Sequence, residues 1–288
     1  MNIPFTKMHG CGNDYVYIDG GRVHLDQGSK PELVRELSDR HFGIGSDGVI
    51  FINPSENADF EMEMWNADGT RAEMCGNGIR SVAKYVYDKG LTQKTDLKIE
   101  SCGKIKEIEI FSCDGKAEMI KVNMGRPVLD PSMIPVISNS ERVVNELIVT
   151  DEKDYHMTCV SMGNPHAVIF MDPDTVDISK VGPLIENHPR FPQRTNTEFV
   201  KVVDRENVLM RVWERGTGET LSCGTGCCAV VVACVLNGLT DDEVTVHVRG
   251  GDIKVKWDQG HDTVYMTGPA KIVFEGEIYY DEDKHELS

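Results

Sequence analysis

Basic residues are in short supply in this chain. It has 30 lysines and arginines against 47 aspartates and glutamates, so its formal net charge is −17 at pH 7. Nucleic acids and anionic membranes are bound through clusters of lysine and arginine, so partners of these two kinds are disfavoured. A small substrate with ammonium groups is compatible with the acidic balance, although an acidic surface is more often related to solubility alone.

Long apolar segments are also lacking. The longest apolar run, from Cys227 to Leu236, is far shorter than the ~20 residues of a membrane-spanning helix. The first residues, Met1 to Lys7, show neither the charged start nor the apolar stretch of a signal peptide. We therefore expect a cytoplasmic protein that does not use a membrane.

No motif for a cofactor or a metal is visible. The sequence has no glycine-rich dinucleotide fingerprint, no P-loop and no paired cysteines of zinc-site spacing. Its nine cysteines are an odd number without a secretory signal, so a disulfide framework is not expected. Cys223 and Cys227 stand four residues apart, but no nearby histidine completes a metal site. We expect reduced thiols, no cofactor and no metal.

What the chain does contain is an internal repeat. Trp65 precedes Cys75 by ten residues, Trp213 precedes Cys223 by ten residues, and both cysteines open a Cys-Gly-x-Gly phrase. The offset, 223 − 75 = 148, is about half of the 288 residues. Gly12-Asn13 and Gly163-Asn164 repeat at nearly the same offset, 163 − 12 = 151. Two matches at one spacing indicate a duplicated domain with one thiol in each copy.

The predicted elements are mainly strands. Alternating or β-branched stretches predict strands at 15–18, 49–52, 60–64, 97–100, 105–111, 117–123, 166–171, 198–203, 208–213, 243–248, 253–257, 263–267 and 272–278. Helices are predicted at 31–40, 77–89 and 225–236, and the last is apolar on every side, which indicates burial. We expect an α/β (α+β-like) fold of two pseudo-symmetric domains, each with a mixed or antiparallel sheet around a central helix. Residues 1–124 and 125–271 form these domains, with the active site in the cleft between them.

The two repeated cysteines suit acid–base chemistry. Each precedes a predicted helix, whose free N–H groups and positive dipole end lower the pKa of a nearby thiol and also bind carboxylates. We therefore expect both Cys75 and Cys223 to carry appreciable thiolate near neutral pH. If both helix starts face one cleft, they bind one substrate carboxylate and place a sulfur on each side of the adjacent α-carbon. That arrangement is typical of a racemase or epimerase that uses two bases.

Other residues near the repeats have both structural and functional interpretations. His166 is either a hydrogen-bonded loop residue or part of the site, and Glu214-Arg215 is either a surface ion pair or a carboxylate-binding element. Four asparagines are either turn formers or ligands for ammonium and carboxylate groups: Asn13, Asn66, Asn164 and Asn196. The remaining lone cysteines are interpreted as small buried hydrophobic residues: Cys11, Cys102, Cys113, Cys159, Cys228 and Cys234.

The motifs together resemble those of the diaminopimelate epimerase family. The similar segments run in the family's order from the first ten residues to about residue 270: Met8-His-Gly-Cys-Gly-Asn-Asp-Tyr15, Asn66-Ala-Asp-Gly69, Met74-Cys-Gly-Asn-Gly-Ile-Arg80, Gly163-Asn-Pro-His166, Thr195-Asn-Thr-Glu198, Glu214-Arg-Gly-Thr-Gly-Glu-Thr220 and Ser222-Cys-Gly-Thr-Gly226. The resemblance implies a cofactor-independent enzyme that interconverts LL- and meso-2,6-diaminopimelate in lysine and cell-wall precursor synthesis. It also implies a homodimer, and a last strand, near 272–288, that packs on the first domain.

The resemblance further implies roles for individual residues. Cys75 and Cys223 match the base and the acid, and His166 and Glu214 match positions that tune the two thiols. The positions that match substrate-binding residues are Asn13, Asn66, Gly76, Asn77, Asn164, Asn196, Glu214, Arg215, Gly224 and Thr225. Gly48 departs from members in which a glutamine at this position contacts substrate, so no side-chain role is expected there.

Three other functions compete with this hypothesis. A proline or hydroxyproline racemase shares the use of two cysteines, but its smaller substrate would not need the extra polar set. A non-catalytic amino-acid-binding protein would not need both cysteines. A thiol redox protein is disfavoured because neither cysteine stands in a Cys-x-x-Cys motif.

Overall fold

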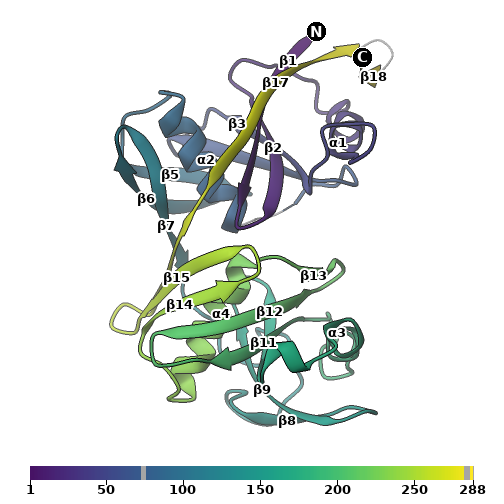
Figure 1. Cartoon of the computed structure of the whole chain (residues 1–288), viewed down its shortest axis with the longest axis vertical. Coiled ribbons are helices and arrows are strands. Elements are labelled where there is room, and N and C mark those ends of the chain that lie inside the picture. The colour runs from purple at the N-terminus through teal and green to yellow at the C-terminus, as the bar shows by residue number, and fades with distance from the viewer. Residues whose placement is uncertain (73–75, 282–285, 288) are drawn as a thin grey trace. The chain divides into compact units, whose positions relative to one another are not determined.

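The computed structural model describes residues 1–72 and 76–281 and the backbone of residues 286–287. The chain divides into two compact units, which are unit 1, Met1–Val122 with Gly268–Ser288, and unit 2, Asn123–Thr267 (Figure 1). Unit 1 therefore takes residues from both ends of the sequence. No helix in the described ranges has the length and apolarity that crossing a bilayer demands.

Unit 1 is a mixed sheet with two helices. Its strands are β1 (Asn2–Gly10), β2 (Asn13–Asp19), β3 (Gly48–Asn53), β4 (Phe60–Asn66), β5 (Asp96–Ser101), β6 (Lys104–Cys113), β7 (Lys116–Gly125), β17 (Lys271–Asp281) and β18 (Glu286–Leu287), and its helices are α1 (Lys30–Ser38) and α2 (Gly76–Asp88). Neighbouring strands pair in the order β17–β1–β2–β3–β4–β5–β6–β7, and β18 pairs with β17. The pairs β2–β3 and β4–β5 are parallel and the other pairs are antiparallel.

Unit 2 has the same plan. Its strands are β8 (Glu146–Val149), β9 (Asp154–Ser161), β10 (Pro165–Phe170), β11 (Asn196–Val202), β12 (Asn207–Glu214), β13 (Gly218–Thr220), β14 (Glu243–Val248), β15 (Gly251–Asp258) and β16 (Thr263–Pro269), and its helices are η1 (Pro173–Thr175), α3 (Ile178–Glu186) and α4 (Gly224–Leu236). The strands pair in the order β8–β9–β10–β11–β12–β14–β15–β16, with β13 added to β12. Here β10–β11 and β12–β14 are the parallel pairs.

The strand registers confirm the predicted pseudo-symmetry residue by residue. Val49 pairs with Trp65 in unit 1, and Thr197 pairs with Trp213 in unit 2, which gives the offset of 148 in both strands. On the other side, Val16 pairs with Val49 and Ala167 pairs with Thr197. These registers define equivalent positions in the two units, and they show that the sequence repeat is a repeat of structure.

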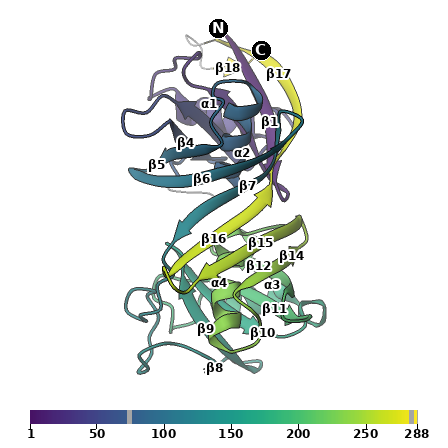
Figure 2. The ribbon, with the colours of Figure 1, turned by 90° about the vertical axis from the view of Figure 1, so that its left-hand side faces the viewer.

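Each sheet wraps around one central helix, as predicted. In α2, Ile79, Val82, Ala83 and Val86 are fully buried, as their helical spacing indicates, and the helix packs on β1, β2 and β6 (Figure 2). In α4 every residue from Cys227 to Cys234 is fully buried, and the helix contacts β9, β10, β11, β14 and β15. Each unit has a second helix that packs on other strands. In unit 1, α1 packs on β3 and β4, and in unit 2, α3 packs on β11 and β12.

Helix α3 was not predicted, because Gly182 and Pro183 interrupt the sequence pattern. The glycine has a packing reason, since a Cβ added to Gly182 would lie 2.4 Å from Cγ of Trp213. Two cysteines also differ from the prediction. Cys102 and Cys113 are exposed rather than buried, because Cys102 lies in the turn before β6 and Cys113 is the last residue of that strand.

Candidate functional site

The Cys223 thiol lies at the start of α4 in unit 2. Cys223 is the N-cap residue with an extended backbone (φ −120°), and only 5% of it is exposed. Its Sγ accepts a hydrogen bond from Gly226 N at 3.4 Å and lies 3.5 Å from Thr225 Oγ1. The predicted contact between this sulfur and the helix start is therefore present.

The expectation of a thiolate at Cys223 is wrong for this structure. Burial raises the pKa of the Cys223 thiol well above its ordinary value, and the nearby carboxyl groups of Glu214 and Glu198 raise it further. The hydrogen bonds from Thr225 and Gly226 lower the pKa but do not outweigh these effects. Desolvation and like charge win over the helix terminus, so Cys223 is held as a thiol near neutral pH.

This protonation state can be tested with a thiol-alkylating reagent. At pH 7 we expect iodoacetamide to modify Cys223 at least ~10-fold more slowly than the exposed Cys102 and Cys113, because only the thiolate reacts and Cys223 is buried. The rate at Cys223 should keep rising as the pH increases, since more thiolate forms as the pH approaches its raised pKa. Peptide mass spectrometry measures each site separately. Equal rates at pH 7 would contradict the raised pKa.

Glu214, at the end of β12, is the acidic neighbour of this thiol. Burial raises the pKa of the Glu214 carboxyl, whereas hydrogen bonds from Thr220 and Cys223 partly oppose the rise. Thr220 Oγ1 donates to Glu214 Oε1 at 2.5 Å. Glu214 is half-buried and Cys223 is buried. A carboxyl group and a thiol that are hydrogen-bonded to each other in such surroundings are disfavoured from both losing their protons.

His166 is connected to two further side chains of unit 2. Its Nδ1 lies 2.6 Å from Oε1 of Glu198, and its Nε2 lies 3.1 Å from Oδ1 of Asn164. Both His166 and Glu198 are fully buried. His166 is thus the centre of a buried polar chain, which runs from the predicted binding residue Asn164 to a carboxyl group that was not predicted as a site residue.

Asn196 and Arg215 are joined through the backbone. The buried side chain of Asn196 accepts a hydrogen bond from Arg215 N at 2.7 Å, and Arg215 Nη1 donates to Gln193 O at 2.9 Å. The Arg215 loop is also fixed by Glu186, whose Oε1 accepts from Gly216 N at 2.9 Å. Asn196 therefore positions the loop that carries Arg215.

Glu186 is a second buried carboxyl group that was not predicted. It accepts hydrogen bonds from Trp213 Nε1 at 2.6 Å and from Gly216 N at 2.9 Å, and it pairs with Arg194 at 3.1 Å. Glu186→Gln removes the charge and replaces one acceptor oxygen by an NH2 group. We expect the free energy of unfolding to fall by about 1–3 kcal/mol. Urea denaturation measures this loss, and an unchanged midpoint would show that Glu186 is not needed to hold Trp213.

In unit 1 the predicted polar residues are also held by specific partners. Asn13 Nδ2 donates to Asp47 Oδ2 at 2.7 Å, and Arg40 Nη2 lies 2.9 Å from both Asp47 Oδ1 and Asp14 Oδ1. Asn66 Nδ2 donates to Thr70 Oγ1 at 3.1 Å. Asp47 and Arg40 thus fix the orientation of the Asn13 amide.

Gly76 and Asn77 begin α2, as the motif predicts, and the buried guanidinium of Arg80 holds them through hydrogen bonds. Arg80 is fully buried and donates to Asn77 Oδ1 at 2.9 Å and to Gly76 O at 3.3 Å. Its Nη2 also lies 3.9 Å from the sulfur of Cys11. Cys75 lies outside the described residues, so its predicted role stays a prediction.

The structure explains the departure at Gly48. Gly48 pairs with Asn66, its φ is +156°, and an added Cβ would lie 2.0 Å from the carbonyl oxygen of Trp65. No side chain fits there, so a contact through a longer residue at this position is excluded in this chain. The neighbouring Asp47 instead acts through Asn13.

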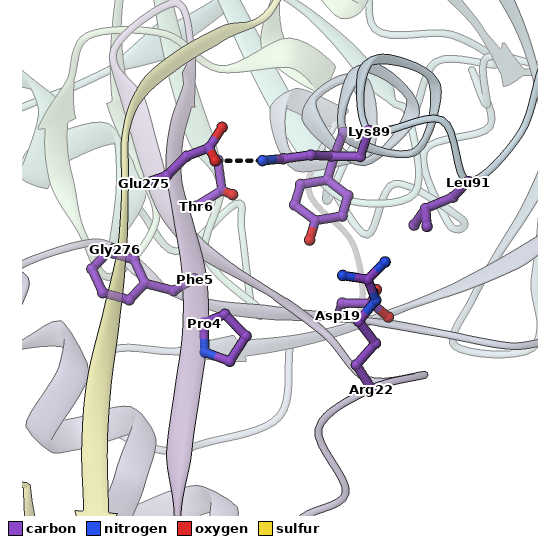
Figure 3. A pocket seen from close by; sticks show the side chains of 10 residues that line it. Pro4, Phe5, Thr6, Asp19, Arg22, Lys89, Leu91, Glu275 and Gly276 are labelled. Atoms are coloured by element: carbon purple, nitrogen blue, oxygen red, sulfur yellow. Dashed lines mark ion pairs between the residues drawn. The ribbon is translucent and has the colours of Figure 1, made fainter.

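A separate pocket of about 170 Å³ lies in unit 1 and contains none of the predicted site residues (Figure 3). Lys89 and Glu275 form an ion pair at 2.5 Å on one side of it, and Arg22 lies 3.3 Å from Asp19 on the other. Its charged groups are paired with one another. Among the described residues, no group of His, Cys, Asp and Glu side chains is arranged to hold a metal ion.

Two of the residues that the motifs predict in unit 2 are thus held by groups that were not predicted: His166 contacts Glu198, and Glu186 fixes the loop of Arg215. In unit 1 the motifs missed Asp47 and Arg80 as supporting residues. The missed residues share one feature that could have indicated their role: each is a charged residue at a buried position or next to a motif. That feature is a weak signal without a structure, because charged residues on strands and helices are usually exposed.

Comparisons with known proteins agree on one family. Residues 5–129 and 158–273 match the family described as diaminopimelate epimerase. A diaminopimelate epimerase of Acetivibrio thermocellus is 52% identical, with 96% of this chain and 99% of that protein covered. One of Methanococcus maripaludis is 50% identical with the same coverage.

Solved structures share the fold at low sequence identity. A hydroxyproline epimerase of Agrobacterium vitis superposes with a TM-score of 0.71 and 15% identity over 96% of this chain and 92% of that chain. A phenazine biosynthesis protein of the PhzF family from Bacillus anthracis gives a TM-score of 0.71 and 18% identity over 97% and 99%. At these identities the likeness shows the two-unit fold alone.

Proposed function

The chain belongs to the diaminopimelate epimerase family, and on this premise we propose that it interconverts LL- and meso-2,6-diaminopimelate. The enzyme is then an isomerase that works without a cofactor, in the synthesis of lysine and peptidoglycan precursors. The observation that carries the proposal is the match over nearly the whole chain to curated relatives of that name, combined with a buried thiol at the start of α4.

The proposed reaction uses two thiols. Cys75 removes the α-proton from one face, and Cys223, which is held as a thiol, then donates its proton to the carbanion from the opposite face. The roles exchange in the reverse direction. The proposal requires both sulfurs to reach the same α-carbon, one from each face.

The binding residues are proposed on the same basis. Gly76 and Asn77 begin α2, and Gly224 and Thr225 begin α4. These helix starts are proposed to bind the reacting carboxylate, because the first N–H groups of a helix favour anions. The polar side chains proposed to bind the other substrate groups are those of Asn13, Asn66, Asn164, Asn196, Glu214 and Arg215. His166 and Glu214 are proposed to set the protonation of the thiols, which the contact of Glu214 with Cys223 supports.

Location and assembly complete the proposal. A cytoplasmic protein is supported by the described cysteines, none of which forms a disulfide. A homodimer is proposed from the family resemblance. Its test is the mass in solution, measured by light scattering.

The function is tested by incubating reduced protein with LL-diaminopimelate in D2O. We expect meso product with deuterium at one α-carbon, because the proton that is returned comes from a thiol that has exchanged with solvent. L-Proline and trans-4-hydroxy-L-proline, offered separately, serve as controls and should not be racemised. Deuterium uptake into proline without diaminopimelate turnover would favour the racemase. Binding of diaminopimelate without any exchange would favour a binding protein.

A further inference from the structure

Glu198 occupies a position where the fold does not require a charge. The strand registers make Ile50 of β3 equivalent to Glu198 of β11, and Tyr15 of β2 equivalent to His166 of β10. Ile50 is fully buried and Tyr15 is 5% exposed. Unit 1 therefore builds the same two neighbouring strands without any ionisable pair at these positions, so a structural need does not explain the pair in unit 2.

Burying the Glu198 carboxyl group is unfavourable unless it is compensated. Glu198 is fully buried, and its Oε1 lies 2.6 Å from Nδ1 of His166. Its second oxygen, Oε2, has no hydrogen-bond partner among the described residues. A buried carboxyl oxygen without a hydrogen-bond partner is costly, so this residue lowers stability relative to an apolar one such as the equivalent Ile50. A residue that weakens the fold points to a role in function.

Glu198 also lies at the thiol-bearing helix start. A Cβ added to Gly226 would be 2.8 Å from Glu198 Oε1 and 3.3 Å from Cys223 Sγ. The first turn of α4 is therefore packed closely against both the carboxyl group and the sulfur. The imidazole that Glu198 contacts reaches in the other direction to Asn164, a proposed binding residue.

We propose that Glu198 is a positioning residue for the epimerisation, which holds the His166 ring through Nδ1 so that Nε2 stays directed at Asn164. This inference rests on the proposed function. The carboxyl group fixes which ring nitrogen faces the binding residues and keeps the ring from rotating, as a carboxylate partner does for other histidines in acid–base sites. Glu198 itself need not touch the substrate.

The test compares Glu198→Gln, His166→Gln and the double variant in the full-length protein. Glu198→Gln keeps the size and an acceptor oxygen but removes the charge, and we expect kcat to fall ~10- to 100-fold while KM changes less than ~3-fold. His166→Gln should lower kcat at least as much. Because Glu198 acts through His166, the double variant should be less than ~2-fold slower than His166→Gln. Glu146→Gln, which removes another carboxylate of unit 2, paired with Arg190, is the matched control and should keep the wild-type kcat.

A second measurement follows the ring without turnover. In wild-type protein the Nδ1 proton shared with Glu198 should give a strongly downfield NMR resonance, which is expected to disappear in both single variants. If wild type has no epimerase activity, the proposed function fails, whereas this resonance still decides whether Glu198 holds the ring. An unchanged kcat in Glu198→Gln, additive losses in the double variant, or a missing resonance in wild type would each overturn the inference. If Glu198→Gln fails to fold, Glu198→Ile, which copies unit 1, replaces it in the same comparison.

Discussion

Alanine at position 223 is expected to abolish epimerisation, with kcat reduced by at least ~10³-fold. Inversion needs a proton to arrive on the face opposite to the one it left, and without the Cys223 thiol that face has no donor. Deuterium that enters LL-diaminopimelate in D2O should therefore appear in substrate of unchanged configuration, because a single base returns the label to the face from which it took the proton. Chiral separation followed by mass spectrometry measures both quantities.

The fold should survive this substitution. The sulfur of Cys223 contacts Gly226 N at 3.4 Å, Thr225 Oγ1 at 3.5 Å and the carboxyl group of Glu214, so a stability loss of about 1 kcal/mol is expected. Cys234→Ala is the matched control, because Cys234 is a fully buried cysteine of the same helix that lies outside the proposed site. It should lose as much stability and keep its activity. A Cys223→Ala protein that formed meso product at a tenth of the wild-type rate would refute the two-thiol mechanism.

Gly226→Ala is expected to lower kcat ~10- to 100-fold without unfolding the protein. The added Cβ would stand 2.8 Å from Glu198 Oε1 and 3.2 Å from Cys223 Cβ, so the carboxyl group or the thiol must move. Alanine is more favourable than glycine in a helix by ~1 kcal/mol, which offsets part of the steric cost to stability. The variant therefore separates the geometry of the site from the stability of the fold.

Steady-state kinetics and thermal melting on the same Gly226→Ala preparation measure the two effects. Gly260→Ala is the comparison, because its Cβ would meet only Asp258 Oδ1, at 3.3 Å, in the turn after β15. It should behave as wild type. A wild-type kcat in Gly226→Ala would mean that the first turn of α4 accommodates the added methyl group without moving Glu198 or Cys223. The proposed arrangement of these two residues would then be wrong.

The sequence was informative wherever a local pattern determined the structure. Helix α2 follows from apolar residues at helical spacing, α4 from its glycine-flanked apolar run, and the internal repeat from two phrases at one offset. Helix α3 could not be foreseen, because Gly182 and Pro183 argue against a helix locally, and the helix is stabilised by packing against Trp213. Strand β1 was missed for a similar reason, since Pro4 stands inside it and pairing with β2 and β17 compensates.

The site shows the same limit. Motif position predicted His166, Glu214 and Cys223, but the protonation state of Cys223 depends on its burial and on the carboxyl groups of Glu214 and Glu198. A helix start near a cysteine predicted a lowered pKa, and desolvation reversed that prediction. Glu198 was not predicted as a site residue, because nothing in the sequence of β11 shows that its side chain contacts a histidine of β10.

The pairing of β1 with β17 has a consequence for synthesis. Eight residue pairs, from Asn2 with Tyr279 to His9 with Lys271, join two segments that lie far apart in the sequence. While the chain is still on the ribosome, β1 has β2 beside it but lacks its other neighbour until residues 271–281 have emerged. Unit 2, which is continuous from Asn123 to Thr267, can be completed earlier. The half that is translated first is therefore the half that finishes folding last, and its open strand edge must be kept from pairing with other chains during that interval.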